Sequence, residues 1–100
     1  MPSGGATGSS RRPNTFFNRK PGRVVRTDRP RARVVFRFGS SLADSSFQCQ
    51  LDRAHYSPCL KRFVRRLLVG RHTLKVKAVT SNGIEDPSAA VTRFRVKQIG

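Results

Sequence analysis

The sequence predicts an all-β fold, a two-sheet antiparallel sandwich of about seven strands. From Thr15 onward, Pro, Gly, Asn or Asp interrupts the chain every 8 to 12 residues, a spacing typical of such folds. Between these breaks, apolar and polar side chains alternate with a period of two, which indicates strands with one buried face. A chain of 100 residues is long enough for one domain with a thin core.

The clearest alternation lies in four segments, RARVVFRF, SFQCQL, HTLKVKAV and TRFRVK. In each of them every second side chain is apolar, and the residues between are mainly polar or basic. The expected core includes Val34, Phe36, Phe38, Phe47, Leu51, Leu74, Val76, Phe94 and Val96.

Three further segments are less regular. NTFFN and GRVVR predict weaker edge strands before Pro30. KRFVRRLLVG has apolar residues at helical spacing, but it is short, lacks an N-cap and contains the β-branched Val64, so a strand is favoured over a basic amphipathic helix. Residues 1–13 show no periodicity and are expected to form a disordered basic tail or linker, which leaves residues 14–100 for the sandwich.

The two cysteines, Cys49 and Cys59, flank a turn. Cys49 lies on the inward face of a strand, LDRA turns the chain, and the return arm through His55 and Tyr56 is expected to end at Pro58. The arms of a hairpin come within the range of a disulfide. Two free thiols remain an alternative, and so does a small Cys–His–Cys metal site with His55, although no CxxC spacing supports a metal or redox site. A disulfide indicates an oxidising compartment.

The charge is strongly basic, because 21 Lys and Arg face five acidic residues and give a net charge of +16. Such a charge is typical of proteins that contact a polyanion, for example nucleic acid, an anionic cell-wall polymer or an acidic protein surface, or that dock into a larger assembly. A solvated basic surface without a partner is the alternative. Most aromatic residues alternate inward, so nucleic acid would be contacted without base readout.

The ordered motifs resemble a bacterial immunoglobulin-like, fibronectin type III-like repeat. The resemblance rests on FRFGS, FQCQLD, PC, GRHTLKVKA, NG, DP and FRV, and it covers about residues 13–97. It implies an immunoglobulin-like β-sandwich, an intradomain Cys49–Cys59 disulfide, and a spacer, adhesive or accessory role in secreted or surface proteins. The loop TSNGIEDP departs from the aspartate-rich loop that such repeats often carry, and the family brings no catalytic residues.

These observations predict a non-catalytic binding or spacer module of a bacterial secreted or surface protein. No cofactor or metal is expected, since His55, His72, Glu85 and Asp86 belong to no known catalytic motif. No apolar run is long enough to span a membrane. The expected location is extracellular or at the cell surface, and because no signal peptide is present, the chain is expected to be flanked by further domains of a longer protein.

The predicted binding residues lie on two strands that should be neighbours in one sheet. With the inward faces as assigned, a set of basic side chains shares the outer face. This candidate polyanion site consists of Lys75, Lys77, Arg93, Arg95 and Lys97.

Overall fold

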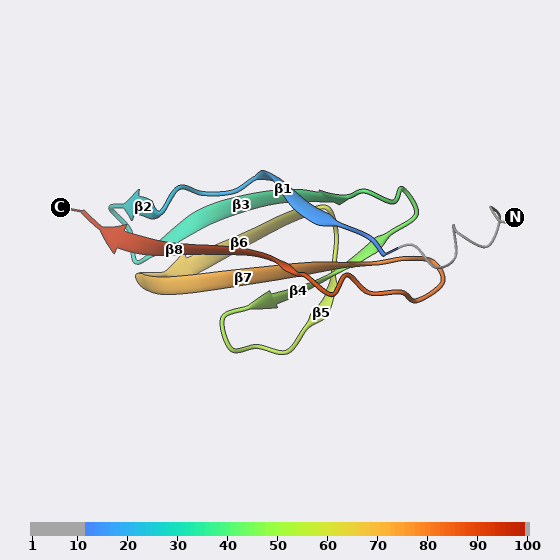
Figure 1. Cartoon of the computed structure of the whole chain (residues 1–100). Helices are drawn as coiled ribbons and strands as arrows, with labels where there is room; N and C mark the ends of the chain where they lie inside the picture. The colour runs from blue at the N-terminus through green and yellow to red at the C-terminus, as the bar shows by residue number, and fades with distance from the viewer. Residues whose placement is uncertain (1–11, 100) are drawn as a thin grey trace, which may run out of the picture.

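The computed structural model describes residues 12–99, and within this range the chain forms eight β-strands and no helix (Figure 1). The strands are β1 (Thr15–Arg19), β2 (Val24–Thr27), β3 (Arg31–Ser40), β4 (Ser46–Leu51), β5 (Ser57–Cys59), β6 (Arg62–Leu68), β7 (Gly70–Val79) and β8 (Ala90–Gln98). They form two packed sheets, so the predicted all-β sandwich is confirmed.

The smaller sheet has the order β1-β3-β6 and the larger has the order β2-β8-β7-β4-β5. The strand count is eight rather than about seven, because the return arm of the cysteine hairpin forms the short strand β5, which includes Pro58 instead of ending there. The sandwich is also not wholly antiparallel. The chain changes sheets between β1 and β2, and β2 therefore runs parallel to β8.

The core lies between the two sheets and contains all nine predicted residues, of which Leu51 is half-buried and packs against the rest. Aromatic rings connect the layers: Phe36 of β3 lies 5.7 Å from Phe94 of β8 between ring centroids, and Phe38 lies 5.1 Å from Phe47 of β4. Such tilted and edge-on pairs add to the free energy of burial. The core cluster also contains Ala32, Cys49, Phe63, Leu67 and Ala78.

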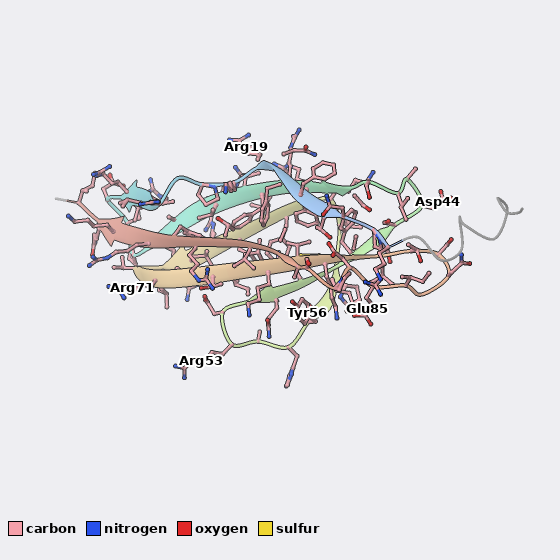
Figure 2. All side chains as sticks on the ribbon, viewed as in Figure 1. Arg19, Asp44, Arg53, Tyr56, Arg71 and Glu85 are labelled. Carbon is pink, nitrogen blue, oxygen red and sulfur yellow. A yellow bond between two sulfur atoms is a disulfide. The ribbon has the colours of Figure 1, made fainter. Side chains whose placement is uncertain are left out.

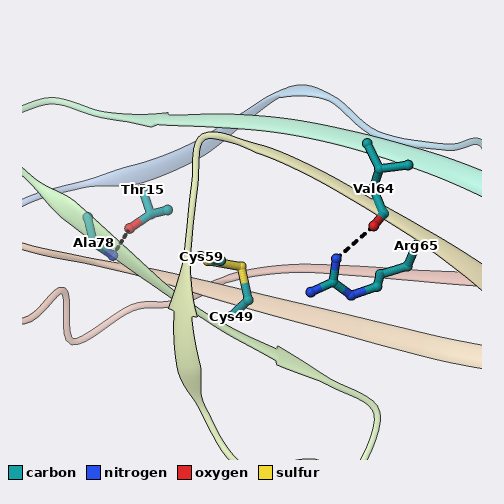
Figure 3. The surroundings of a disulfide bond; sticks show 6 residues. All are labelled: Thr15, Cys49, Cys59, Val64, Arg65 and Ala78. Atoms are coloured by element: carbon teal, nitrogen blue, oxygen red, sulfur yellow. Dashed lines mark hydrogen bonds between the residues drawn. A yellow bond between two sulfur atoms is a disulfide. The ribbon is translucent and has the colours of Figure 1, made fainter.

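The segment with ambiguous spacing is the strand β6, which pairs with β3 and forms an edge of the smaller sheet. Phe63 and Leu67 point inward, and Arg65 shares their side of the strand but is exposed. Its guanidinium lies 4.0 Å from the Phe63 ring centroid and donates to the Val64 carbonyl at 2.7 Å (Figure 3). A charge at an inward position protects an edge strand against pairing with another chain.

The two cysteines form a disulfide, as predicted (Figure 3). Cys49 pairs with Ser57 and Phe47 pairs with Cys59, so the bridge joins diagonal positions of the hairpin with 5.8 Å between the Cα atoms. Closing a loop of this size stabilises the fold by about 2–3 kcal/mol in the chain-entropy account.

A buried polar network ties β1 to the loop between β7 and β8. Asp86 is buried and accepts hydrogen bonds from the backbone N–H and the hydroxyl of Thr15 (2.8 and 2.7 Å). The Thr15 hydroxyl in turn accepts a bond from the Ala78 N–H. Pro13, the last residue of the predicted tail, is buried, whereas residues 1–11 of that tail, and Gly100, lie outside the described residues.

Candidate polyanion-binding surface

The five predicted basic residues lie on the outer side of the larger sheet. The register pairs Arg71 with Arg95, Thr73 with Arg93 and Lys75 with Val91, and the side chains between them on each strand are those of the core. Residues at alternate positions of paired strands share a face. Lys75, Lys77, Arg93, Arg95 and Lys97 therefore stand on one surface, which we call the five-strand face.

The two lysines of β7 are set apart from the three basic residues of β8. Lys77 forms an ion pair with Glu85, and its ammonium lies 4.4 Å from the Tyr56 ring centroid. Lys75 has the apolar Val91 on one side and Gln50 on the other. The like charges are thus less continuous at this end of the face than the sequence predicts.

Three arginines that the sequence did not single out extend the other end of the face. Arg71 lies directly opposite Arg95. Arg26 pairs with Lys97 in the parallel register of β2 and β8, and the Arg23 carbonyl accepts a hydrogen bond from the Arg95 N–H at 2.8 Å. Arg71 could have been found by extending the alternation of HTLKVKAV back by one outward position. The parallel pairing that brings Arg23 and Arg26 here has no signal in the sequence.

A shallow hollow of about 350 Å³ lies at this end of the five-strand face. Four arginines contribute to it, and no acidic residue does. The residues that line it are Arg23, Arg71, His72, Thr73, Arg93, Phe94 and Arg95. Guanidinium groups bind phosphate, sulfate and carboxylate oxygens in a planar, bidentate manner, so the hollow is suited to an oxyanion group.

At the rim of this hollow, Asp52 holds His72 and Thr73. Asp52 Oδ2 lies 2.7 Å from His72 Nδ1, and Asp52 Oδ1 accepts the Thr73 N–H at 2.8 Å. The second ring nitrogen, His72 Nε2, lies 2.7 Å from the Leu68 carbonyl oxygen. Partial burial lowers the pKa of His72, but the Leu68 carbonyl and the Asp52 carboxylate outweigh it and raise the pKa above 6.5. Both partners are acceptors, so both bonds need the doubly protonated ring.

A second, larger hollow of about 810 Å³ lies between β2 and the part of β3 that β1 does not cover. Apolar side chains such as Val25 and Ala32 contribute to its lining, together with Asp28 at the β2–β3 turn. Its basic lining residues are Arg26, Arg29, Arg31, Arg33 and Arg66. This hollow increases the basic character of the end of the sandwich where β8 finishes.

Among residues 12–99, no group of three or more His, Cys, Asp or Glu side chains is placed to hold a metal ion. The part of the chain that the structure describes also contains no helix long and apolar enough to cross a membrane. Comparison of the sequence with protein families and with curated proteins found no match in either case.

Proposed function

We propose that this chain is a non-catalytic β-sandwich module of a bacterial secreted or surface protein, and that it binds a polyanion through the five-strand face. The observation that carries the proposal is the hollow lined by Arg23, Arg71, Arg93 and Arg95 without an acidic side chain. Arg71 and Arg95 stand directly opposite each other, an arrangement that destabilises a strand pair unless counter-charge is near. A bound oxyanion supplies that counter-charge.

The expected contact is electrostatic and independent of polymer sequence. Neutralising phosphates with Arg and Lys releases condensed counterions, which makes the affinity strongly dependent on salt. Among the described Phe and Tyr side chains only Phe16 is exposed, and it lies on the other sheet. Tyr56, beside Lys77 of the five-strand face, is half-buried, and the Lys77 ammonium lies over its ring. Stacking on bases or sugars is therefore not part of the proposed contact on the five-strand face.

The extracellular location is proposed from two observations. The disulfide between Cys49 and Cys59 is typical of oxidising compartments, and the sequence resembles repeats of secreted and surface proteins. The polymer is accordingly one that such a module can meet outside the cell, either extracellular nucleic acid or an anionic wall polymer.

A spacer role is the second candidate, and the course of the chain favours it. β1 starts at one end of the sandwich and β8 finishes at the opposite end (Figure 1). A domain whose chain enters and leaves at opposite ends can be placed end to end in a tandem array. A spacer requires no ligand, so the two candidates differ in whether the five-strand face binds anything.

The test replaces Arg23, Arg71, Arg93 and Arg95 by Gln and measures binding to duplex DNA and to a polyol-phosphate polymer over a salt series. If the four residues contact phosphates, the slope of log affinity against log salt should become shallower by about 3–4 units. Affinity should also fall more than tenfold at about 0.1 M salt.

The matched control replaces four exposed basic residues outside this face, Arg12, Lys20, Arg53 and Lys61, by Gln. Both variants fall from a net charge of +16 by four, to +12. Equal losses in the two variants would show that net charge alone attracts the polymer. Absence of binding by the wild-type protein to either polymer would leave the spacer role.

A further inference from the structure

The outer side of the smaller sheet carries a second basic surface. On β3 and β6 the register places Arg33 opposite Arg66 and Arg37 opposite Arg62, and Arg19 of β1 stands on the other side of Arg37. We call this surface the three-strand face, and its basic residues are Arg19, Arg31, Arg33, Arg37, Arg62 and Arg66. All six side chains belong to exposed residues.

Within the described part of the chain no acidic side chain forms an ion pair with these arginines, and Asp28 is the one acid that shares a hollow with some of them, Arg31, Arg33 and Arg66. Asp52 and Glu85 are bound to His72 and Lys77, and Asp86 is buried in its own network. The two remaining acids, Asp28 and Asp44, lie in the β2–β3 and β3–β4 connections. Like charges directly opposite on paired strands are destabilising. This face has three such arginine pairs in its register, Arg19 with Arg37, Arg37 with Arg62, and Arg33 with Arg66.

The two basic faces point in opposite directions. They are the outer sides of two sheets that pack through a shared core, so the thickness of the sandwich separates them. Figure 2 shows Arg19 of the three-strand face and Arg71 of the five-strand face projecting to opposite sides of the molecule. A stiff ligand that lies on one face cannot reach the other.

We propose that the domain is bivalent and bridges two DNA duplexes, one bound to each face. This inference rests on the proposed function of the five-strand face and adds a second, independent site. The basic character of the three-strand face comes from arginine alone, which suits the paired oxygens of phosphate groups. From Arg31 to Arg37 the strand spans about 20 Å, a length over which a duplex presents about 12 phosphates.

Duplex DNA is favoured as the ligand of both faces because it is stiff and its phosphate backbone is uniform. With a persistence length of about 150 base pairs, a duplex cannot wrap around one small domain, so opposite faces must engage separate duplexes. The single exposed ring on this side, Phe16, covers the backbone at Gly39, where an added Cβ would meet the ring at 3.1 Å. Because Phe16 lies over Gly39, contact with the phosphate backbone is made by the arginines of the three-strand face, and no ring stacks on the bases.

The experiment uses two populations of DNA duplexes, one with a donor dye and one with an acceptor dye. Each duplex has about 30 base pairs, far below the persistence length. Wild-type protein should bridge a donor duplex and an acceptor duplex and so produce energy transfer between them. The signal should decline when protein is in large excess, because each duplex is then covered by its own protein molecules and none is left to be bridged. Binding to a single immobilised duplex is measured in parallel.

The diagnostic variant carries Arg33→Gln, Arg37→Gln, Arg62→Gln and Arg66→Gln. It should keep binding to a single duplex through the five-strand face, within about tenfold of the wild type at 0.1 M salt, and its energy transfer should fall at least tenfold. The variant with Arg12, Lys20, Arg53 and Lys61 replaced by Gln removes the same charge from other exposed positions and should retain most of the transfer. A reduction-sensitive mass shift and a cooperative melt confirm that each variant is folded.

Three results would overturn the inference while leaving the proposed function intact. The wild-type protein could bind a single duplex without energy transfer, or the diagnostic variant could bridge as well as the wild type, which would indicate self-association through another surface. The polyol-phosphate polymer could instead displace the labelled duplexes from both faces at concentrations where unlabelled duplex DNA does not. That result would identify this polymer, and not duplex DNA, as the ligand. If the wild-type protein binds no duplex at all, the proposed duplex contact of both faces fails.

Discussion

Asp52 illustrates at the residue scale how one side chain fixes the rim of the arginine-lined hollow. It occupies a left-handed backbone conformation with φ of 56°, which Asn and Asp tolerate better than most residues. From there its carboxylate binds the His72 ring and the Thr73 N–H. Asp52 and His72 are 20 residues apart in the chain.

Asp52→Asn should lower the pKa of His72 and flatten the dependence of stability on pH. Asn keeps the backbone conformation and can still accept the Thr73 N–H, but it carries no charge. In the wild type the pKa of His72 is raised in the folded state. The protonated ring therefore contributes its full stability below pH 6.5, and this stability is lost as pH rises through the pKa of His72 in the folded protein. NMR titration of His72 and urea unfolding at pH 5.5 and 8.5 measure both effects. An identical pH dependence of unfolding in the variant would contradict this account.

Asp86→Ala should destabilise the fold by about 2–4 kcal/mol, because it leaves the buried Thr15 N–H without its acceptor. The neighbouring Glu85→Ala is the matched control. Glu85 is exposed and loses only its ion pair with Lys77, which should cost less than about 1 kcal/mol. Denaturant unfolding of both variants gives the comparison, and equal losses would show that the buried network is not what holds β1 in place.

At the scale of elements, the pairing of β3 with β6 combines a well-packed inner face with a repulsive outer face. Val34, Phe36 and Phe63 lie in the core, while Arg33 and Arg66 stand directly opposite each other on the outer side. Apolar burial on one side of the sheet thus offsets electrostatic repulsion on the other. A strand pair that only had to be stable would not need these arginines.

Arg66→Glu should therefore stabilise the free protein by about 0.2–1 kcal/mol, since it converts a like-charged cross-strand pair into an opposite-charged one. The same change should weaken duplex binding on the three-strand face. Lys61→Glu makes an equal change in net charge just before β6, outside the paired residues, and separates the local effect from the global one. Thermal unfolding gives the stabilities, and a variant less stable than the control would show that Arg66 contributes through packing instead.

At the scale of the whole molecule, the net charge of +16 opposes the compact state through self-repulsion. The Tm of the free protein should rise when salt is increased from about 0.01 to 0.15 M, because the Debye length then falls from about 30 to about 8 Å. All three four-residue variants, each with a net charge of +12, should show a smaller rise. A Tm that is independent of salt would mean that the basic faces impose no measurable strain on the free domain.

Much of the fold could be predicted because side-chain alternation reports directly on which face of a strand is buried. Phe36, Val76 and Val96 are fully buried where the pattern places them, and the cysteines bridge because a short hairpin brings its own arms together. The short strand β5 and the parallel placement of β2 could not be predicted. A strand of three residues, such as β5, is too short to show a clear alternation. The sheet that an edge strand such as β2 joins depends on contacts made elsewhere in the chain.

By itself, the sequence determined all the strands but β5, their inward and outward sides, the disulfide and the size of the positive charge. These are local properties, set by a period of two and by short loops. Only the tertiary structure decided which residues become neighbours: Arg71 with Arg95 and Arg23 on the surface, Arg33 with Arg66 on the other face, and the buried Asp86 with Thr15 across 71 positions. The hydrophobic pattern limits each strand to registers that keep its apolar face inward. The partner strand and the exact register also depend on contacts between segments that are distant in the chain.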